Sequence, residues 1–202
     1  MRDADNAQDI VEIDEVEGDR AREYALLAVL LAAAPSPDLL ARLAMLCGDA
    51  STLGAAHRAL AEAAAATTGV NVEREFFTLF VGIGRGELLP YGSYYLTGFL
   101  HDRPLAQLRA DLVQLGIERV QGFAEPEDHA AVLCDIMAGL VDGRFAPPPN
   151  ADRDMFNSHL APWIGRFFAD LEQARGADFY RCVGAVGRQF VAIENEAFSL
   201  AA

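Results

Sequence analysis

The segment from Glu125 to Val141, EPEDHAAVLCDIMAGLV, decides the fold class, because a polar turn with a proline runs directly into an apolar stretch. Its larger apolar side chains recur at intervals of three and four residues, which is the spacing of one face of an α-helix. They are Val132, Leu133, Ile136, Met137, Leu140 and Val141. Proline suits the first turn of a helix, and carboxylates are favoured at its positive end. The pattern predicts a helix that starts within EPEDH and buries one face, with the His129 ring turned toward that face.

The same combination of a start signal and an apolar face recurs along the chain. Helix-capping side chains precede several of the apolar segments. The expected starts are Ser36 before Pro37, Ser51 before a helix to Ala66, Asn71 before Phe76–Phe80, and Asp102 with Pro104 before a helix closed by Gly116. Further helices are expected around residues 24–34, 163–171 and 179–197. No segment alternates apolar and polar residues between turns, as a strand would. We therefore predict an all-α protein, a single helical bundle of roughly 8–11 helices.

Two segments stand apart from the expected bundle. Residues 1–15 are rich in Asp and Glu, which predicts an acidic, mobile N-terminal tail ahead of a helical domain at 16–202. Three consecutive prolines at 147–149 cannot continue a helix. We therefore expect a hinge within residues 143–152, centred on 146–151.

The charge balance limits the partners. The chain has 30 acidic and 16 basic residues, which gives a net charge of −14 at pH 7. Such a protein repels nucleic-acid phosphates and anionic membrane surfaces, whereas a basic peptide remains a suitable partner. No apolar run reaches the roughly 18 residues that cross a bilayer, and the apolar stretch 24–34 follows an acidic rather than a basic leader. We therefore predict a cytoplasmic protein that does not insert into membranes.

The EPEDH segment has three interpretations: a capped helix start, a binding surface, or a catalytic or metal cluster. A small metal-dependent hydrolase would use Glu125, Asp128 and His129, whereas an acidic helical scaffold would use none of them. The chain has no HExxH pattern, and GIGRG at 82–86 follows a helix and lacks the spacing of a nucleotide-binding loop. The three cysteines are far apart. We expect no catalytic residue, no cofactor and no metal.

Aromatic residues gather in the loop after GIGRG, where a plain core would not need them. They are Tyr91, Tyr94, Tyr95 and Phe99. Loops carry function and tyrosines are frequent contact residues, so these side chains either bind a partner or cover the core locally.

Four short motifs follow one another in a characteristic order. LFVG ends one helix at residues 79–82, PYGSYY follows at 90–95, EPEDH opens the next helix at 125–129, and FNSHLAPW follows at 156–163. This order and spacing resembles the TorD/DmsD family of redox-enzyme maturation chaperones, to which NarJ proteins are related. The resemblance covers roughly residues 24–196.

The resemblance implies a cytoplasmic all-helical chaperone rather than an enzyme. It would bind the twin-arginine signal peptide or N-terminal region of a molybdenum-cofactor oxidoreductase, of the DMSO/TMAO reductase or formate dehydrogenase type. It would hold that apoenzyme until cofactor insertion is complete. The peptide-binding residues carried over are Leu79, Phe80, Pro90, Tyr91, Ser93, Tyr95, Asp128 and His129. The resemblance is compatible with a monomer or a helix-swapped homodimer, and it makes EPEDH one wall of a peptide groove.

Overall fold

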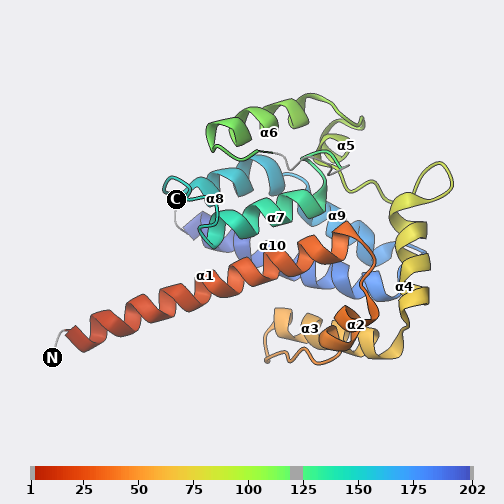
Figure 1. The fold of residues 1–202 in the computed structure, drawn as a ribbon, viewed down its shortest axis with the longest axis horizontal. Coiled ribbons are helices and arrows are strands. Elements are labelled where there is room, and N and C mark those ends of the chain that lie inside the picture. Colours follow the sequence, from red (N-terminus) through yellow and green to blue (C-terminus); the bar gives the residue numbers. More distant parts are fainter. Residues whose placement is uncertain (1–2, 119–124, 201–202) are drawn as a thin grey trace.

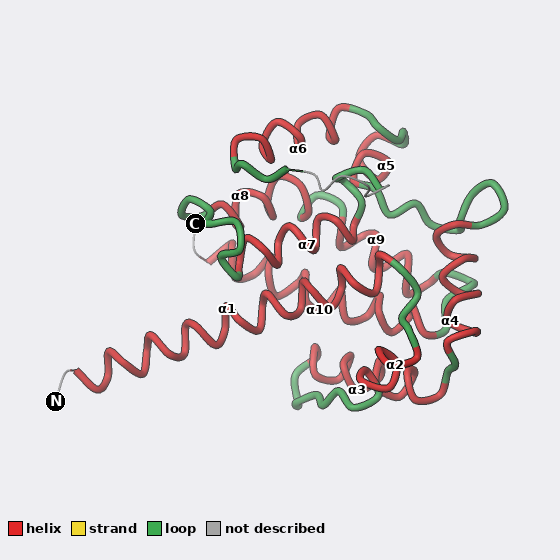
Figure 2. Tube along the Cα trace, in the orientation of Figure 1, coloured by secondary structure: helices red, strands yellow, loops and turns green. Residues whose placement is uncertain are grey.

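The computed structural model describes residues 3–118 and 125–200, with side chains from residue 15 onward. The chain forms ten α-helices and two short π-helical turns in these ranges, and no β-strand (Figures 1 and 2). The elements are α1 (Asp3–Ala32), α2 (Pro37–Leu43), α3 (Thr52–Ala66), α4 (Gly69–Phe76), η1 (Phe77–Val81), α5 (Gly92–Thr97), α6 (Arg103–Gln114), α7 (Ala130–Val141), α8 (Ala151–Met155), η2 (Phe156–Leu160), α9 (Ile164–Gln173) and α10 (Phe179–Leu200). The all-α prediction is confirmed.

Helix α7 lies in the middle of the bundle and packs along α1, while α10 packs on both α9 and α3 (Figure 1). The apolar face predicted for α7 is present, but burial extends almost all round the helix. Its buried residues are Ala130, Ala131, Leu133, Cys134, Ile136, Met137, Ala138, Gly139 and Leu140. A helix that is apolar on every side belongs in the interior. The segment that decides the fold class is therefore also the centre of the core.

Helix starts were predicted correctly where the cap lies next to the helix it serves. The side chains of Ser36 and Ser51 accept backbone N–H groups at the starts of α2 and α3, and Asp102 does so for α6. Each cap satisfies an amide that has no partner within its own helix.

Two predicted helix starts were wrong. Helix α4 begins at Gly69, and its cap is Thr68, whose hydroxyl accepts the amide of Asn71. Helix α7 begins at Ala130, so the EPEDH carboxylates lie in the turn before the helix rather than in its first turn. In both cases the residue directly before the helix provides the cap, Thr68 for α4 and His129 for α7.

Helix α1 begins at Asp3, so the segment predicted as a tail is continuous with the first helix. Its mobility stays a prediction. The prolines at 147–149 lie in the non-helical connection between α7 and α8, as expected. A hinge motion at 143–152 and an exchange of helices between subunits stay predictions.

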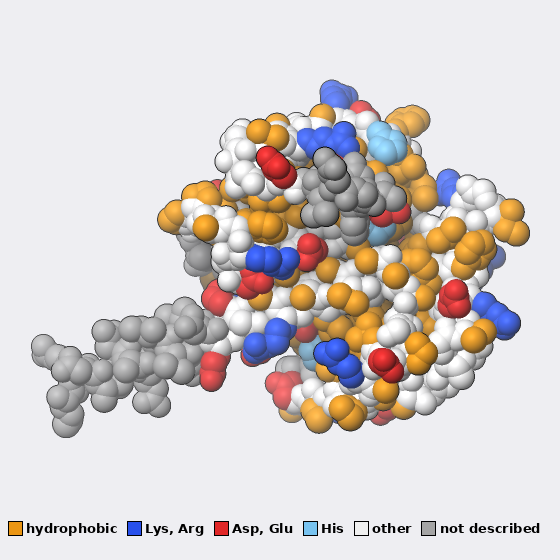
Figure 3. Space-filling model, viewed as in Figure 1, with side chains coloured by type: hydrophobic (Ala, Val, Ile, Leu, Met, Phe, Trp, Pro, Cys, Tyr) orange, Lys and Arg blue, Asp and Glu red, His pale blue; other side chains and the backbone are white. Residues whose placement is uncertain are grey.

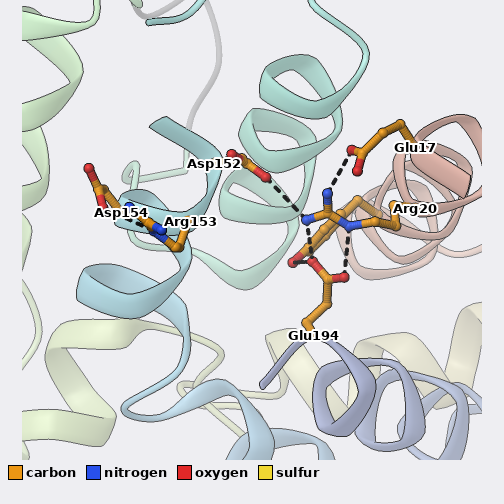
Figure 4. Close-up of polar contacts among 7 residues, drawn as sticks. Glu17, Arg20, Asp152, Arg153, Asp154 and Glu194 are labelled. Carbon is orange, nitrogen blue, oxygen red and sulfur yellow. Dashed lines mark hydrogen bonds and ion pairs between the residues drawn. The ribbon is translucent and has the colours of Figure 1, made fainter. Parts of the chain in front are cut away.

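An ion-pair cluster fixes α1 to the C-terminal helices (Figure 4). The Arg20 guanidinium on α1 lies 2.8 Å from the Glu194 carboxylate on α10 and 3.2 Å from the Asp152 carboxylate on α8. The Tyr24 hydroxyl also donates to Glu194, at 2.9 Å. Because Glu194 is only 1% exposed, these donors replace the hydration that its carboxylate loses on burial.

Candidate functional site

Two turns far apart in the sequence, residues 90–95 and 125–130, lie against each other at the start of α7. We call them the paired turns. Tyr91 and His129 form an isolated antiparallel bridge between them. Two backbone hydrogen bonds flank this bridge, from the amide of Gly92 to the carbonyl of Asp128 at 2.9 Å and from the amide of Ala130 to the carbonyl of Pro90 at 2.8 Å. The backbone therefore brings PYGSYY and EPEDH together as one rigid wall.

The Tyr91 side chain strengthens the contact between the paired turns. Its hydroxyl donates to the Glu125 carboxylate at 2.6 Å, and its ring packs edge-on against the His129 ring at 5.0 Å between centroids. Burial, followed by the hydrogen bond to Glu125, raises the pKa of Tyr91 well above its usual value. The phenol therefore remains a hydrogen-bond donor at any physiological pH.

His129 caps α7. Its Nδ1 accepts the amide of Ala131 at 3.1 Å, and the residue is 6% exposed. Burial lowers the pKa of His129, although Glu125 and Asp128 act in the opposite direction. The ring is therefore neutral near pH 7, and an accepting Nδ1 places its proton on Nε2.

Asp128 and Ser93 form the polar centre of the paired turns. The Asp128 Oδ2 atom accepts the amide of Ser93 at 2.8 Å, and the two residues are 3% and 0% exposed. The second carboxylate oxygen of Asp128, Oδ1, and the hydroxyl oxygen of Ser93, Oγ, are buried and have no hydrogen-bond partner in the described part of the chain. Both residues line a pocket of about 200 Å³. Its other lining residues are Tyr91, Leu100, His101 and Pro126.

A larger cavity of about 360 Å³ lies between α1, α6 and α7, and Glu125 belongs to its lining. Apolar side chains from all three helices contribute to it, among them Val29, Leu112, Val132 and Ile136. Four carboxylates and one guanidinium also line it: Glu118, Glu125, Glu127, Asp135 and Arg144. The cavity is therefore apolar with an acidic margin, and it shares the Glu125 turn with the smaller pocket.

Three of the predicted binding residues pack in or against the core: Leu79 and Phe80 lie outside the paired turns, and Tyr95 lies at the end of the first turn. Leu79 is fully buried, and the Phe80 ring packs on Tyr180 at 5.4 Å between centroids. The Tyr95 ring packs on Trp163 at 5.4 Å, and its hydroxyl donates to Asp170. These three side chains support the core, and a role for them in binding stays a prediction.

The segment that contains Leu79 nevertheless offers an exposed apolar surface, which sequence reasoning missed. Phe77, Val81 and Ile83 are 46%, 50% and 98% exposed. Figure 3 shows apolar side chains gathered on this side of the molecule, over α4 and the loop that follows η1. The π-helical turn η1 changes which side chains face outward, and no pattern in the sequence announces it.

A metal-dependent hydrolase would need several metal-ligating side chains close together. Among the described residues, no group of three or more His, Cys, Asp and Glu side chains is placed to hold a metal ion. Nor does any helix in those ranges combine the length and apolar character that a membrane span requires.

Comparison with known proteins identifies the family. The sequence profile of the nitrate reductase delta subunit family matches residues 48–169, which is more than half of the chain. The chain belongs to this family.

Curated relatives include the Chaperone protein TorD of Vibrio cholerae, 28% identical over 126 residues, which cover 58% of this chain and 57% of the relative. The Chaperone protein TorD of Photobacterium profundum is 35% identical over 69 residues, 33% of this chain and 32% of the relative. The matched segments therefore cover 57% and 32% of the length of these two relatives. These relatives are chaperones, not enzymes.

A solved structure shares the fold. A proposed redox enzyme maturation protein from Archaeoglobus fulgidus has a TM-score of 0.56 and 18% sequence identity. The match covers 86% of this chain and 93% of that protein.

Proposed function

We propose that this protein is a cytoplasmic chaperone for the maturation of a molybdenum-cofactor oxidoreductase. It binds the twin-arginine signal peptide, or the N-terminal region, of the apoenzyme and holds it until the cofactor is inserted. One observation carries the proposal: the paired turns unite the family motifs PYGSYY and EPEDH beside an apolar cavity with an acidic margin. The protein acts as a monomer or as a helix-swapped homodimer.

The chemistry of the cavity suits such a ligand. A twin-arginine leader has a basic segment followed by an apolar one. The apolar segment fits the cavity between α1, α6 and α7, and the basic segment fits its carboxylate margin. Apolar contact provides most of the affinity, since exposed ion pairs contribute only about 0.2–1 kcal/mol each and mainly orient the peptide.

The expected affinity follows from the buried area. Burying about 400 Å² of leader at about 25 cal/mol/Å² provides about 10 kcal/mol. Ordering a flexible peptide costs about 2–5 kcal/mol, which leaves about 5–8 kcal/mol. Lost translational and rotational freedom weakens binding further, so a dissociation constant of about 1 µM is the tightest that this apolar contact provides.

Calorimetric titration of the intact chain with leader peptides of molybdoenzymes encoded nearby tests the proposal. We expect one peptide per chain to bind, and Val29→Trp, which fills the cavity from α1, to weaken binding about tenfold. Val113→Trp is the matched control, because Val113 is exposed on α6 and is not among the cavity residues. Equal binding by both variants would place the leader elsewhere, and no binding to any leader would refute the proposed function.

A further inference from the structure

We propose that the 200 Å³ pocket of the paired turns binds a single guanidinium group, the side chain of one arginine in the partner's basic segment. This inference rests on the proposed function and specifies what one part of the site recognises. The guanidinium would donate to two buried oxygens of residues that line the pocket, Asp128 Oδ1 and Ser93 Oγ.

The two oxygens are the primary argument. A buried polar atom normally has a hydrogen-bond partner, because burial without one costs the full loss of its hydration. Here both atoms are buried and unpartnered within the described chain, and both belong to residues that line the same pocket. The Asp128 carboxylate is held in place by the amide of Ser93, so its free oxygen has a fixed direction. A ligand that donates hydrogen bonds would satisfy both atoms at once.

The charge around the pocket favours a cation as this donor. Asp128 lines the pocket, and Glu125 lies beside it, bonded to the Tyr91 hydroxyl. No arginine is among the described lining residues, and the chain contains no lysine. The adjacent His129 ring does not supply a positive charge near pH 7, because burial lowers its pKa. His101 also lines the pocket, and it is exposed to solvent.

The shape and composition of the pocket favour a guanidinium over other cations. A metal ion would need further ligands, and no group of three ligating side chains exists among the described residues. A planar guanidinium presents several N–H donors in a fixed fork, so it can reach two separate oxygens, whereas an ammonium is a single compact charge. Tyr91, Leu100 and Pro126 provide apolar surface for the methylene stem.

The test is calorimetric titration of the intact protein with three peptides. One is a twin-arginine leader peptide, and in each of the other two a lysine replaces one of the two arginines. We expect lysine at one of the two positions to weaken binding about tenfold or more, because the fork is lost. Asp128→Asn should weaken binding of the arginine peptide to a similar degree and remove the preference for arginine over lysine.

Ser93→Ala keeps the test valid if Asp128→Asn fails to fold. The Ser93 hydroxyl has no partner among the described residues, so its removal should leave thermal stability unchanged while weakening arginine binding about threefold to tenfold. Equal binding of arginine and lysine peptides by the wild type would overturn the inference and leave the proposed function standing. The inference would also be overturned if the Asp128→Asn and Ser93→Ala proteins both still bind the arginine peptide more tightly than the lysine peptides. Failure of every peptide to bind the folded protein would instead refute the proposed function.

Discussion

The Arg20 cluster allows the most quantitative prediction about the fold. Arg20→Met removes the guanidinium that donates two hydrogen bonds of 2.8 Å to the Glu194 carboxylate. Glu194 is 1% exposed and would keep Tyr24 as its donor in this cluster. Leaving a buried charge without its ion-pair partner costs about 3–5 kcal/mol, and we expect Arg20→Met to lower the free energy of unfolding by this amount.

The size of the effect can be checked in two ways. For a chain of this length, about 3–5 kcal/mol corresponds to a decrease in Tm of about 6–20 °C, measurable by circular dichroism, and urea denaturation gives the free energy directly. The double variant Arg20→Met with Glu194→Gln has no buried unpaired charge, so it should recover most of the loss. A decrease below about 1 kcal/mol, or a double variant less stable than Arg20→Met, would refute the assignment of this cluster as the tie between α1 and α10.

Two further predictions concern single carboxylates. The Glu75 carboxylate accepts three backbone amides around the start of α10, including that of Tyr180 at 2.6 Å. Glu75→Ala should therefore lower the free energy of unfolding by about 1–3 kcal/mol, measured by urea denaturation. A change within about 0.5 kcal/mol would contradict this. The His57 ring lies 3.0 Å from Glu23, and this hydrogen bond raises the pKa of His57 above its ordinary value of 6.5. The contact therefore stabilises the folded state fully below about pH 6.5 and is lost as pH rises through the raised pKa. Glu23→Gln should remove this dependence from a series of denaturation curves at pH 5–9, and an unchanged dependence would show that another group causes it.

The accuracy of the sequence predictions depended on the distance between interacting groups. Caps beside their helices, such as Ser36 and Ser51, were predicted because a hydroxyl three residues before an amide is a local geometry. Glu75 lies within α4, but its partner Tyr180 is 105 positions further along the chain. No local pattern contains that information.

The same limit applies to the candidate site. The resemblance to a known family selected both halves of the paired turns, and the structure brings them together. Nothing in the sequence predicted that the amide of Ser93 would bond to Asp128, or that two buried oxygens would have no partner within residues 3–118 and 125–200. The larger cavity depends on Val29 of α1 and Val132 of α7, which are far apart in the sequence and meet only through tertiary packing.

Photo-cross-linking would test the central claim most directly, because it reports where the leader lies. A leader peptide with a photoreactive phenylalanine in its apolar segment would be irradiated with the intact protein, and the linked residues would be identified by mass spectrometry. The account predicts links to the cavity between α1 and α7, at Val29, Val132 or Ile136. Links confined to the exposed surface of Phe77, Val81 and Ile83 would contradict it.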